Sequence, residues 1–259
     1  MKITAALSWW DELPEDLDAC VTGVASVADR IVAVDGAYRR YPNGTARSDD
    51  AQVAAIRDAA AASGIECLII QPDRMWTGEI EKRSTMMAIA AIATDWVIVI
   101  DADHVVSAIR KEVRTELSQT SADTIEVPFI TPLLKGRTLA ESSATNWHAR
   151  QNAGKEWLPL IFRALPGLTV ERRHWWYSAY KNGTKVCLGG WDGTLPEVQH
   201  ARITTRYSVE HRCLYRSPER IRVQRAWYND RVIVVEKTGQ EDSQPGLPES
   251  VYDYETVPY

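Results

Sequence analysis

The chain has 259 residues, of which 45% are hydrophobic and 25% charged, and its formal net charge at pH 7 is −5. This composition is typical of a globular protein with a sizeable core, and the acidic balance argues against a general nucleic-acid binder. The four cysteines form no C-x-x-C pair, which argues against structural zinc and a disulfide framework. We expect a cytoplasmic protein, because the sequence shows neither a signal peptide nor an apolar stretch of 18 residues.

The first hundred residues alternate between short β-branched runs and longer stretches with helical spacing. Strands are predicted at 2–7, 31–34, 65–70 and 96–100, and helices at 13–28, 50–63 and 80–93. Alternation of this kind predicts a parallel sheet flanked by helices, with all strands ending at one edge, where ligands bind. The run 96–100 is apolar without alternation, which indicates a strand covered on both faces.

The second half of the chain changes character. Strands are predicted at 124–130, 157–163, 169–180 and 185–188, a helix at 217–228, and a long loop at 131–155. Asn182-Gly183 predicts a tight hairpin turn between the last two strands. From residue 238 onward hydrophobic residues thin out, so this segment is predicted to be a loop, a disordered tail or a flap that orders on a ligand.

The strongest local signal is Asp101-Ala102-Asp103, directly after the apolar run 96–100. Side chains at i and i+2 of an extended chain point to the same side, so Asp101 and Asp103 can converge on one cation. Carboxylate oxygens suit Mg²⁺ or Mn²⁺, which neutralises a diphosphate leaving group. A bare D-x-D is commonly a pair of solvated loop aspartates, but the buried strand before it favours a site.

Two further segments carry charged residues toward the same edge of the predicted sheet. Asp35 ends the second strand and can accept hydrogen bonds from a base or a ribose, or it is an ordinary turn aspartate. Lys82 and Arg83 open the helix that precedes the D-x-D strand, and arginine suits a diphosphate. The alternative for this pair is a solvated helix start.

Taken in order, these segments resemble the nucleotide-binding half of GT-A glycosyltransferases, especially those of the large family 2 type. The similar segments over residues 1–130 are Ser8-Trp9-Trp10-Asp11-Glu12 after the first strand, Asp35 after the second, Lys82-Arg83-Ser84, and Asp101-Ala102-Asp103. The chain departs from the family pattern after Asp35, where Gly36-Ala37-Tyr38-Arg39-Arg40 replaces the usual Ser-Thr-Asp ending.

The resemblance implies an α/β fold of GT-A type, with a mostly parallel central sheet flanked by helices and a mixed, acceptor-binding C-terminal half. It implies transfer of a sugar from a nucleoside diphosphate sugar, a UDP-sugar by analogy, to a hydroxyl of a glycan, lipid, protein or small molecule. The cofactor would be Mn²⁺ or Mg²⁺. Residues 1–130 would bind the donor, 131–237 would bind the acceptor and complete the metal site, and 238–259 would form the tail or flap. The implied donor-binding residues in the first half are Ser8, Trp9, Asp35, Lys82, Arg83, Asp101 and Ala102.

The family also implies a metal ligand from the C-terminal half, commonly a histidine. The five histidines of the chain are His104, His148, His174, His200 and His211. We expect His211 to be the ligand, because it ends a strand-like run and precedes a basic segment, and neutral imidazole is a good Mn²⁺ ligand. The predicted metal ligands are therefore Asp101, Asp103 and His211, with His200 as the weaker alternative.

Arginines are concentrated around His211, and in an acidic protein such a cluster needs an anionic partner. The arginine cluster consists of Arg202, Arg206, Arg212, Arg216, Arg220, Arg222, Arg225 and Arg231. A diphosphate is one such partner, and neighbouring acidic residues such as Glu210 are the other. Arg216 and Arg220 are the predicted phosphate contacts.

The acceptor is expected to contact His174, Trp175 and Trp191, whose aromatic rings suit a sugar platform, unless these tryptophans belong to the core. An inverting reaction needs a carboxylate base, for which Asp192 and Glu197 are the candidates. A retaining reaction needs no such base, and the sequence leaves this alternative open.

Two other functions are compatible with the sequence. A nucleotidyltransferase or pyrophosphorylase is also α/β with metal-binding carboxylates, but it usually opens with a glycine-rich loop that Ser8–Glu12 lacks. The second alternative is a non-catalytic nucleotide- or carbohydrate-binding module of the same fold.

Overall fold

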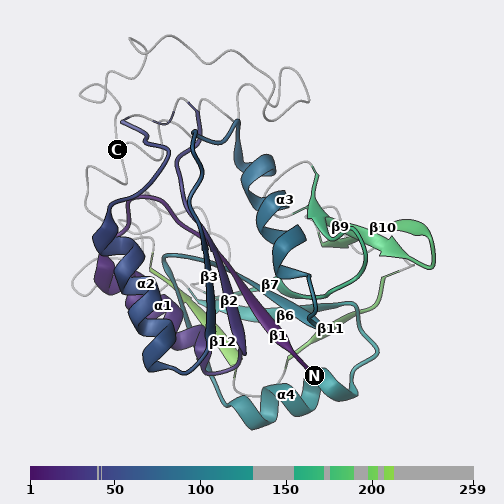
Figure 1. Ribbon diagram of the computed structural model, residues 1–259. Helices are drawn as coiled ribbons and strands as arrows, with labels where there is room; N and C mark the ends of the chain where they lie inside the picture. The colour runs from purple at the N-terminus through teal and green to yellow at the C-terminus, as the bar shows by residue number, and fades with distance from the viewer. Residues whose placement is uncertain are drawn as a thin grey trace, which may run out of the picture.

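The computed structural model describes residues 1–39, 41, 43–130, 155–171, 176–189, 198–203 and 207–212. These residues form an α/β fold with one large mixed sheet, helices on its faces and a small antiparallel sheet (Figure 1). The helices are α1 (Pro14–Ala25), α2 (Asp50–Ala62), α3 (Glu79–Ala90) and α4 (Arg110–Gln119).

The strands of the N-terminal half are β1 (Ile3–Ser8), β2 (Arg30–Val34), β3 (Glu66–Ile70), β4 (Trp96–Asp101), β5 (His104–Ala108) and β6 (Thr124–Ile130). Those that follow are β7 (Lys155–Arg163), β8 (Thr169–Val170), β9 (Tyr177–Lys181), β10 (Thr184–Gly189), β11 (His200–Arg202) and β12 (Tyr207–His211).

Among the described residues the large sheet has nine strands in the order β3-β2-β1-β4-β7-β6-β12-β5, with β11 also paired to β6. The first four strands are parallel, as the strand–helix alternation predicted. The prediction of a mostly parallel sheet is wrong, however, because β7 enters between β4 and β6 and runs antiparallel to both. At the far end β12 is parallel to β6 and antiparallel to β5, so the sheet as a whole is mixed.

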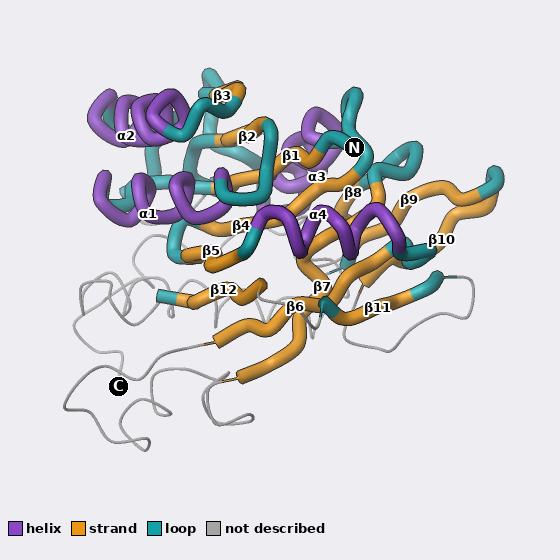
Figure 2. The backbone as a smooth tube through the Cα atoms, turned by 90° about the horizontal axis from the view of Figure 1, so that it is seen from below, coloured by secondary structure: helices purple, strands orange, loops and turns teal. Residues whose placement is uncertain are grey.

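Strand β4 is covered on both faces, as its unbroken apolar run predicted. Trp96, Ile98 and Ile100 pack in one core cluster with residues of α1, α2 and α4. Val97 and Val99 pack in the other, with residues of α3 and of the small sheet β10-β9-β8. Figure 1 shows α1 and α2 on one side of the sheet and α3 with β9 and β10 on the other, and Figure 2 shows the same layers from below.

Helix α1 approaches β5 closely at Gly23. A Cβ atom added to Gly23 would lie 2.7 Å from the backbone oxygen of Val106 and 2.9 Å from its nitrogen. Only glycine leaves room for this contact. Helix α1 therefore supports the strand that begins at His104.

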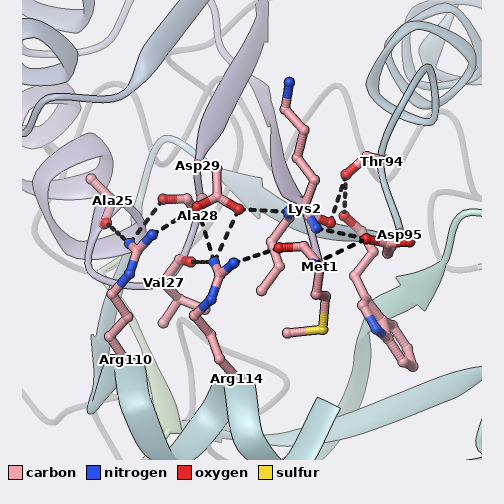
Figure 3. A network of polar contacts seen from close by, with 12 residues as sticks. Met1, Lys2, Ala25, Val27, Ala28, Asp29, Thr94, Asp95, Arg110 and Arg114 are labelled. Carbon is pink, nitrogen blue, oxygen red and sulfur yellow. Dashed lines mark hydrogen bonds and ion pairs between the residues drawn. The ribbon is translucent and has the colours of Figure 1, made fainter. Parts of the chain in front are cut away.

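A network of polar contacts lies at the N-terminal ends of the parallel strands (Figure 3). Asp29 accepts hydrogen bonds from the backbone N–H of Ile3 and from the guanidinium groups of Arg110 and Arg114 on α4. Arg114 also donates to the carbonyl oxygens of Val27 and Met1. These contacts tie α4 to the end of α1 and the start of β1.

The hairpin predicted at Asn182-Gly183 is confirmed, since β9 and β10 pair antiparallel and both turn residues have positive φ, 53° and 78°. The single strand predicted at 169–180 is wrong. It is two antiparallel strands, β8 and β9, so the chain reverses between them. Strands β5 and β11 and helix α4 were not predicted. The predicted helix at 217–228 and the tail from 238 lie outside the described residues.

Residues on both sides of position 130 share the large sheet, because β4 pairs with β7 and β6 pairs with β12. None of the helices in the described part of the chain is long and apolar enough to cross a membrane.

Candidate functional site

The loops that follow the parallel strands meet at one edge of the sheet. The register aligns Ser8, the last residue of β1, with Val34 at the end of β2 and with Asp101 at the end of β4. The segments that begin at Trp9, Asp35 and Ala102 therefore leave the sheet side by side, as expected for parallel strands. This edge holds most of the charged side chains that the sequence singled out.

Strand β12 brings His211 to Asp103. In the antiparallel pair β12–β5 His211 lies opposite His104, and the backbone N–H of Arg212 donates to the backbone oxygen of Asp103 at 2.7 Å. As a result Nε2 of His211 lies 3.2 Å from Oδ2 of Asp103. The structure thus places the predicted C-terminal ligand, His211, next to Asp103 of the D-x-D motif.

His104 is the third member of this group, since one potential ligand atom of each of Asp103, His104 and His211 lies within 4.8 Å of the others. Nδ1 of His104 accepts a hydrogen bond from the backbone N–H of Asp101 at 3.1 Å, and Nε2 lies 3.9 Å from Oδ1 of Asp103. Burial lowers the pKa of His104 to about 4 against the opposing effect of the nearby aspartates, so the ring is neutral.

Asp101 is not part of this group. Both of its carboxylate oxygens accept hydrogen bonds from Nη2 of Arg83, at 2.7 and 2.9 Å, and Arg83 also donates through Nε to Glu79 at 2.8 Å. Burial alone would raise the pKa of Asp101, but the Arg83 guanidinium outweighs it and the pKa is lowered. The i and i+2 rule does not apply to this turn, because β4 ends at Asp101 and Asp103 lies between two strands.

Asp35 is completely buried in this structure. Its carboxylate accepts hydrogen bonds from the backbone N–H of Gly36, from the N–H and hydroxyl of Ser48, and from the side-chain amide of Gln71. The backbone oxygen of Asp35 accepts a further bond from Trp76 Nε1 at 2.7 Å. Asp35 thus organises the loop after β2 and offers no exposed surface to a nucleotide in this conformation.

Lys82 and Arg83 are buried, not solvated as an ordinary helix start would be. Nζ of Lys82 donates to the backbone oxygens of Trp9 at 2.7 Å and Gly36 at 2.8 Å, so it joins the loops after β1 and β2. Burial lowers the pKa of Lys82 to about 7. Ser8 and Trp9 are also buried, and the indole N–H of Trp9 has no hydrogen-bond partner within the described residues.

Three half-buried aromatic residues at the same edge were not singled out from the sequence. The rings of Trp10 and Tyr41 meet edge to face with centroids 4.9 Å apart, and Trp10 Nε1 donates to the hydroxyl of Thr45 at 3.2 Å. The ammonium group of Lys82 lies 5.5 Å from the ring centroid of Tyr38. Their position in the loops that follow two parallel strands was the signal that could have indicated them.

Seven of the predicted site residues lie outside the described part of the chain, namely Arg216, Arg220, His174, Trp175, Trp191, Asp192 and Glu197. His200 is described, and it pairs with Thr124 at the start of β6, whereas β12 pairs with residues at the end of β6. Within the arginine cluster, Arg202 bonds to Glu126 and Arg212 to Glu210, so these two have acidic partners in the protein.

No protein-family model matches the chain, and no curated protein matches it in sequence.

The pair Asp103–His211 fits a divalent cation. Two neighbouring ligands at about 2.1 Å from one ion are about 3 Å apart, and the two atoms here are 3.2 Å apart. A carboxylate with an imidazole suits Mn²⁺ better than Mg²⁺, which prefers oxygen ligands alone. The other interpretation of this contact is a hydrogen-bonded histidine–aspartate pair with no metal.

Proposed function

We propose that this chain is a metal-dependent glycosyltransferase of GT-A type. It would transfer a sugar from a nucleoside diphosphate sugar, with UDP as the expected nucleotide, to an acceptor hydroxyl. The observation that carries the proposal is the contact of Asp103 with His211 at the edge where β1, β2 and β4 end. A ligand site at this edge is the rule for open α/β sheets.

Each of the described site residues would have a separate role. Asp103 and His211 would hold the cation, Mn²⁺ before Mg²⁺, and a bound cation would neutralise the charge of the diphosphate as it leaves. Asp101 is one quarter exposed (25%) and is oriented by Arg83, which leaves it accessible to a hydroxyl of the donor. Trp10, Tyr38 and Tyr41 offer aromatic surface for a base or a sugar.

Lys82 and Asp35 would act on the loops and not on the nucleotide directly. Lys82 joins the loops after β1 and β2 through hydrogen bonds to their backbone oxygens. Asp35 holds the loop after β2 in place by accepting a hydrogen bond from the N–H of Ser48. A preformed site loses less conformational entropy when a ligand binds, so rigid loops favour affinity. The acceptor residues and the general base stay predictions on residues outside the described part of the chain.

The test is a screen of UDP- and GDP-sugars for slow hydrolysis in the presence of Mn²⁺. We expect at least one donor to be hydrolysed, and we expect Asp103→Asn to abolish hydrolysis while the thermal unfolding transition persists. Asp18→Asn, on an exposed position of α1, is the matched control and should retain full turnover.

Three results would contradict the proposal. Unchanged turnover in Asp103→Asn would show that Asp103 belongs only to a turn. Pyrophosphate release from a nucleoside triphosphate and a sugar phosphate would indicate a nucleotidyltransferase. Nucleotide binding without turnover of any donor would indicate a non-catalytic module.

A further inference from the structure

Two histidines lie beside Asp103 at the candidate metal site, and their ring nitrogens differ in their ability to bind a metal. Asp103, His104 and His211 together form a carboxylate and two imidazoles within 4.8 Å, which at first sight is a three-ligand site. A histidine binds a metal only through a nitrogen that carries no proton. The hydrogen bonds of each ring therefore decide its role.

The backbone N–H of Asp101 fixes the tautomer of His104. A backbone amide can only donate, so Nδ1 of His104 accepts this bond at 3.1 Å with its lone pair. The proton of the neutral ring is then on Nε2, which has no lone pair to offer. Nε2 is the atom of His104 that faces Asp103.

The two oxygens of Asp103 face different histidines. Oδ1 lies 3.9 Å from Nε2 of His104, and Oδ2 lies 3.2 Å from Nε2 of His211. The distance to His104 is longer than a hydrogen bond, and Oδ2 is the carboxylate oxygen that lies next to His211. His104 is 2% exposed and packs edge to face against Phe129 and His211, so its ring has little freedom to turn.

We infer that His104 is a positioning residue and not a third metal ligand. Its Nδ1 holds the backbone at the start of the D-x-D turn, and its protonated Nε2 has no lone pair for a metal, so Oδ2 of Asp103 and His211 form the protein part of the metal site. This inference rests on the proposed function, because it assigns a role within the metal site proposed there.

Two substitutions distinguish the roles of the two ring nitrogens of His104. In His104→Asn the amide oxygen can take the place of Nδ1, whereas in His104→Gln the amide reaches the place of Nε2 and the acceptor for Asp101 N–H is lost. If His104 positions the turn, His104→Asn should bind Mn²⁺ within about fivefold of the wild type. The Mn²⁺ affinity of His104→Gln should fall by about 10- to 100-fold, which is the usual effect of losing a group that orients a metal ligand.

Mn²⁺ binding is measured by the loss of the free-ion EPR signal, with His200→Asn as the histidine control. Pulsed EPR then reports directly on the imidazole nitrogens bound to the metal. We expect coupling to one imidazole in the wild type and in His104→Asn, and none in His211→Ala at saturating Mn²⁺.

Coupling to two imidazoles in the wild type, or to one in His211→Ala, would overturn the inference and leave the metal site standing. So would stronger binding by His104→Gln than by His104→Asn. A wild-type protein that binds no Mn²⁺ would instead overturn the metal-dependent function, and this inference with it. The wild-type spectrum decides the ligand count even if a variant does not fold.

Discussion

Arg83 is the residue that makes the acidic end of β4 compatible with burial. Its guanidinium is 7% exposed and pairs with Glu79, also 7% exposed, and with Asp101. Removing one member of a buried ion pair leaves the other charge without compensation. The sequence predicted that Arg83 lies at this edge, but it could not indicate that the side chain turns inward toward the protein's own carboxylates.

We therefore predict that Arg83→Met lowers the free energy of unfolding by about 3–5 kcal/mol. Arg47→Met is the comparison, because Arg47 pairs with Asp73 at the surface, where the Asp73 side chain is 95% exposed. That variant should lose less than about 1 kcal/mol. Urea unfolding of both variants measures the difference, and equal losses would contradict the role given to Arg83.

Lys82 makes the stability depend on pH in a defined window. Burial lowers its pKa from 10.5 to about 7 in the folded protein. Between these values the unfolded chain holds a proton that the folded chain has released, so stability rises with pH. We predict that the free energy of unfolding of the wild type, minus that of Lys82→Met, increases from pH 7 to pH 9.5. A constant difference across urea titrations at several pH values would show that Lys82 is not buried in this way.

At the scale of elements, the contact between α1 and β5 supports the strand that follows the D-x-D turn. A methyl group at position 23 would meet the backbone of Val106, two residues after His104. We predict that Gly23→Ala loses about 1–3 kcal/mol of stability, although alanine is normally the better helix former by about 1 kcal/mol. Thr22→Ala, at an exposed position of the same helix, is the control and should be neutral or stabilising in thermal unfolding. An equal gain in both variants would refute the close contact.

The attachment of α4 to the rest of the fold also depends on one residue, Asp29, which pairs with two arginines of this helix (Figure 3). Burial raises the pKa of Asp29, but the backbone N–H of Ile3 and the guanidinium of Arg114 outweigh it and lower the pKa below 3.8. The stabilisation is therefore present above the pKa of the unfolded chain and is lost as the pH falls through the folded value.

We predict that Asp29→Asn lowers the free energy of unfolding by about 1–3 kcal/mol at pH 7 and that the difference shrinks in acid. Asp58→Asn, at an exposed position of α2, should have little effect at either pH. A difference for Asp29→Asn that persists unchanged at pH 2 would contradict this role.

The elements that the sequence predicted well are those with a local pattern. Strands β1 to β4 and their helices have apolar runs and helical spacing. The connections from β1 to β2 and from β2 to β3 join neighbouring strands, whereas the connection from β3 to β4 passes β2 and β1. Strand β5 could not be predicted in this way, because its pairing partner β12 lies far from it in the sequence. Five residues without alternation carry little local signal, and non-local pairing decides their structure.

At the scale of the whole molecule, the candidate metal site depends on the continuity of the sheet. β4 and β5 bring the D-x-D turn, while β6 and β12 bring His211, and the mixed half of the sheet joins these strands. The sequence predicted that Asp103 and His211 belong to one site with Asp101, and the structure places Asp103 and His211 3.2 Å apart. That they bind a metal stays a prediction. The sequence could not predict that Asp101 pairs with Arg83, or that His104 joins the group, because these contacts follow from the turn geometry between β4 and β5.

The most direct test is the affinity for UDP, measured by calorimetry with Mn²⁺ and without it, for the wild type and for His211→Ala. A metal held by Asp103 and His211 predicts that Mn²⁺ strengthens UDP binding to the wild type at least about tenfold, which corresponds to about 1.4 kcal/mol. It also predicts that His211→Ala loses this gain while keeping the weak binding without metal. UDP binding that is absent, or equally strong with and without Mn²⁺, would contradict a metal-dependent nucleotide site.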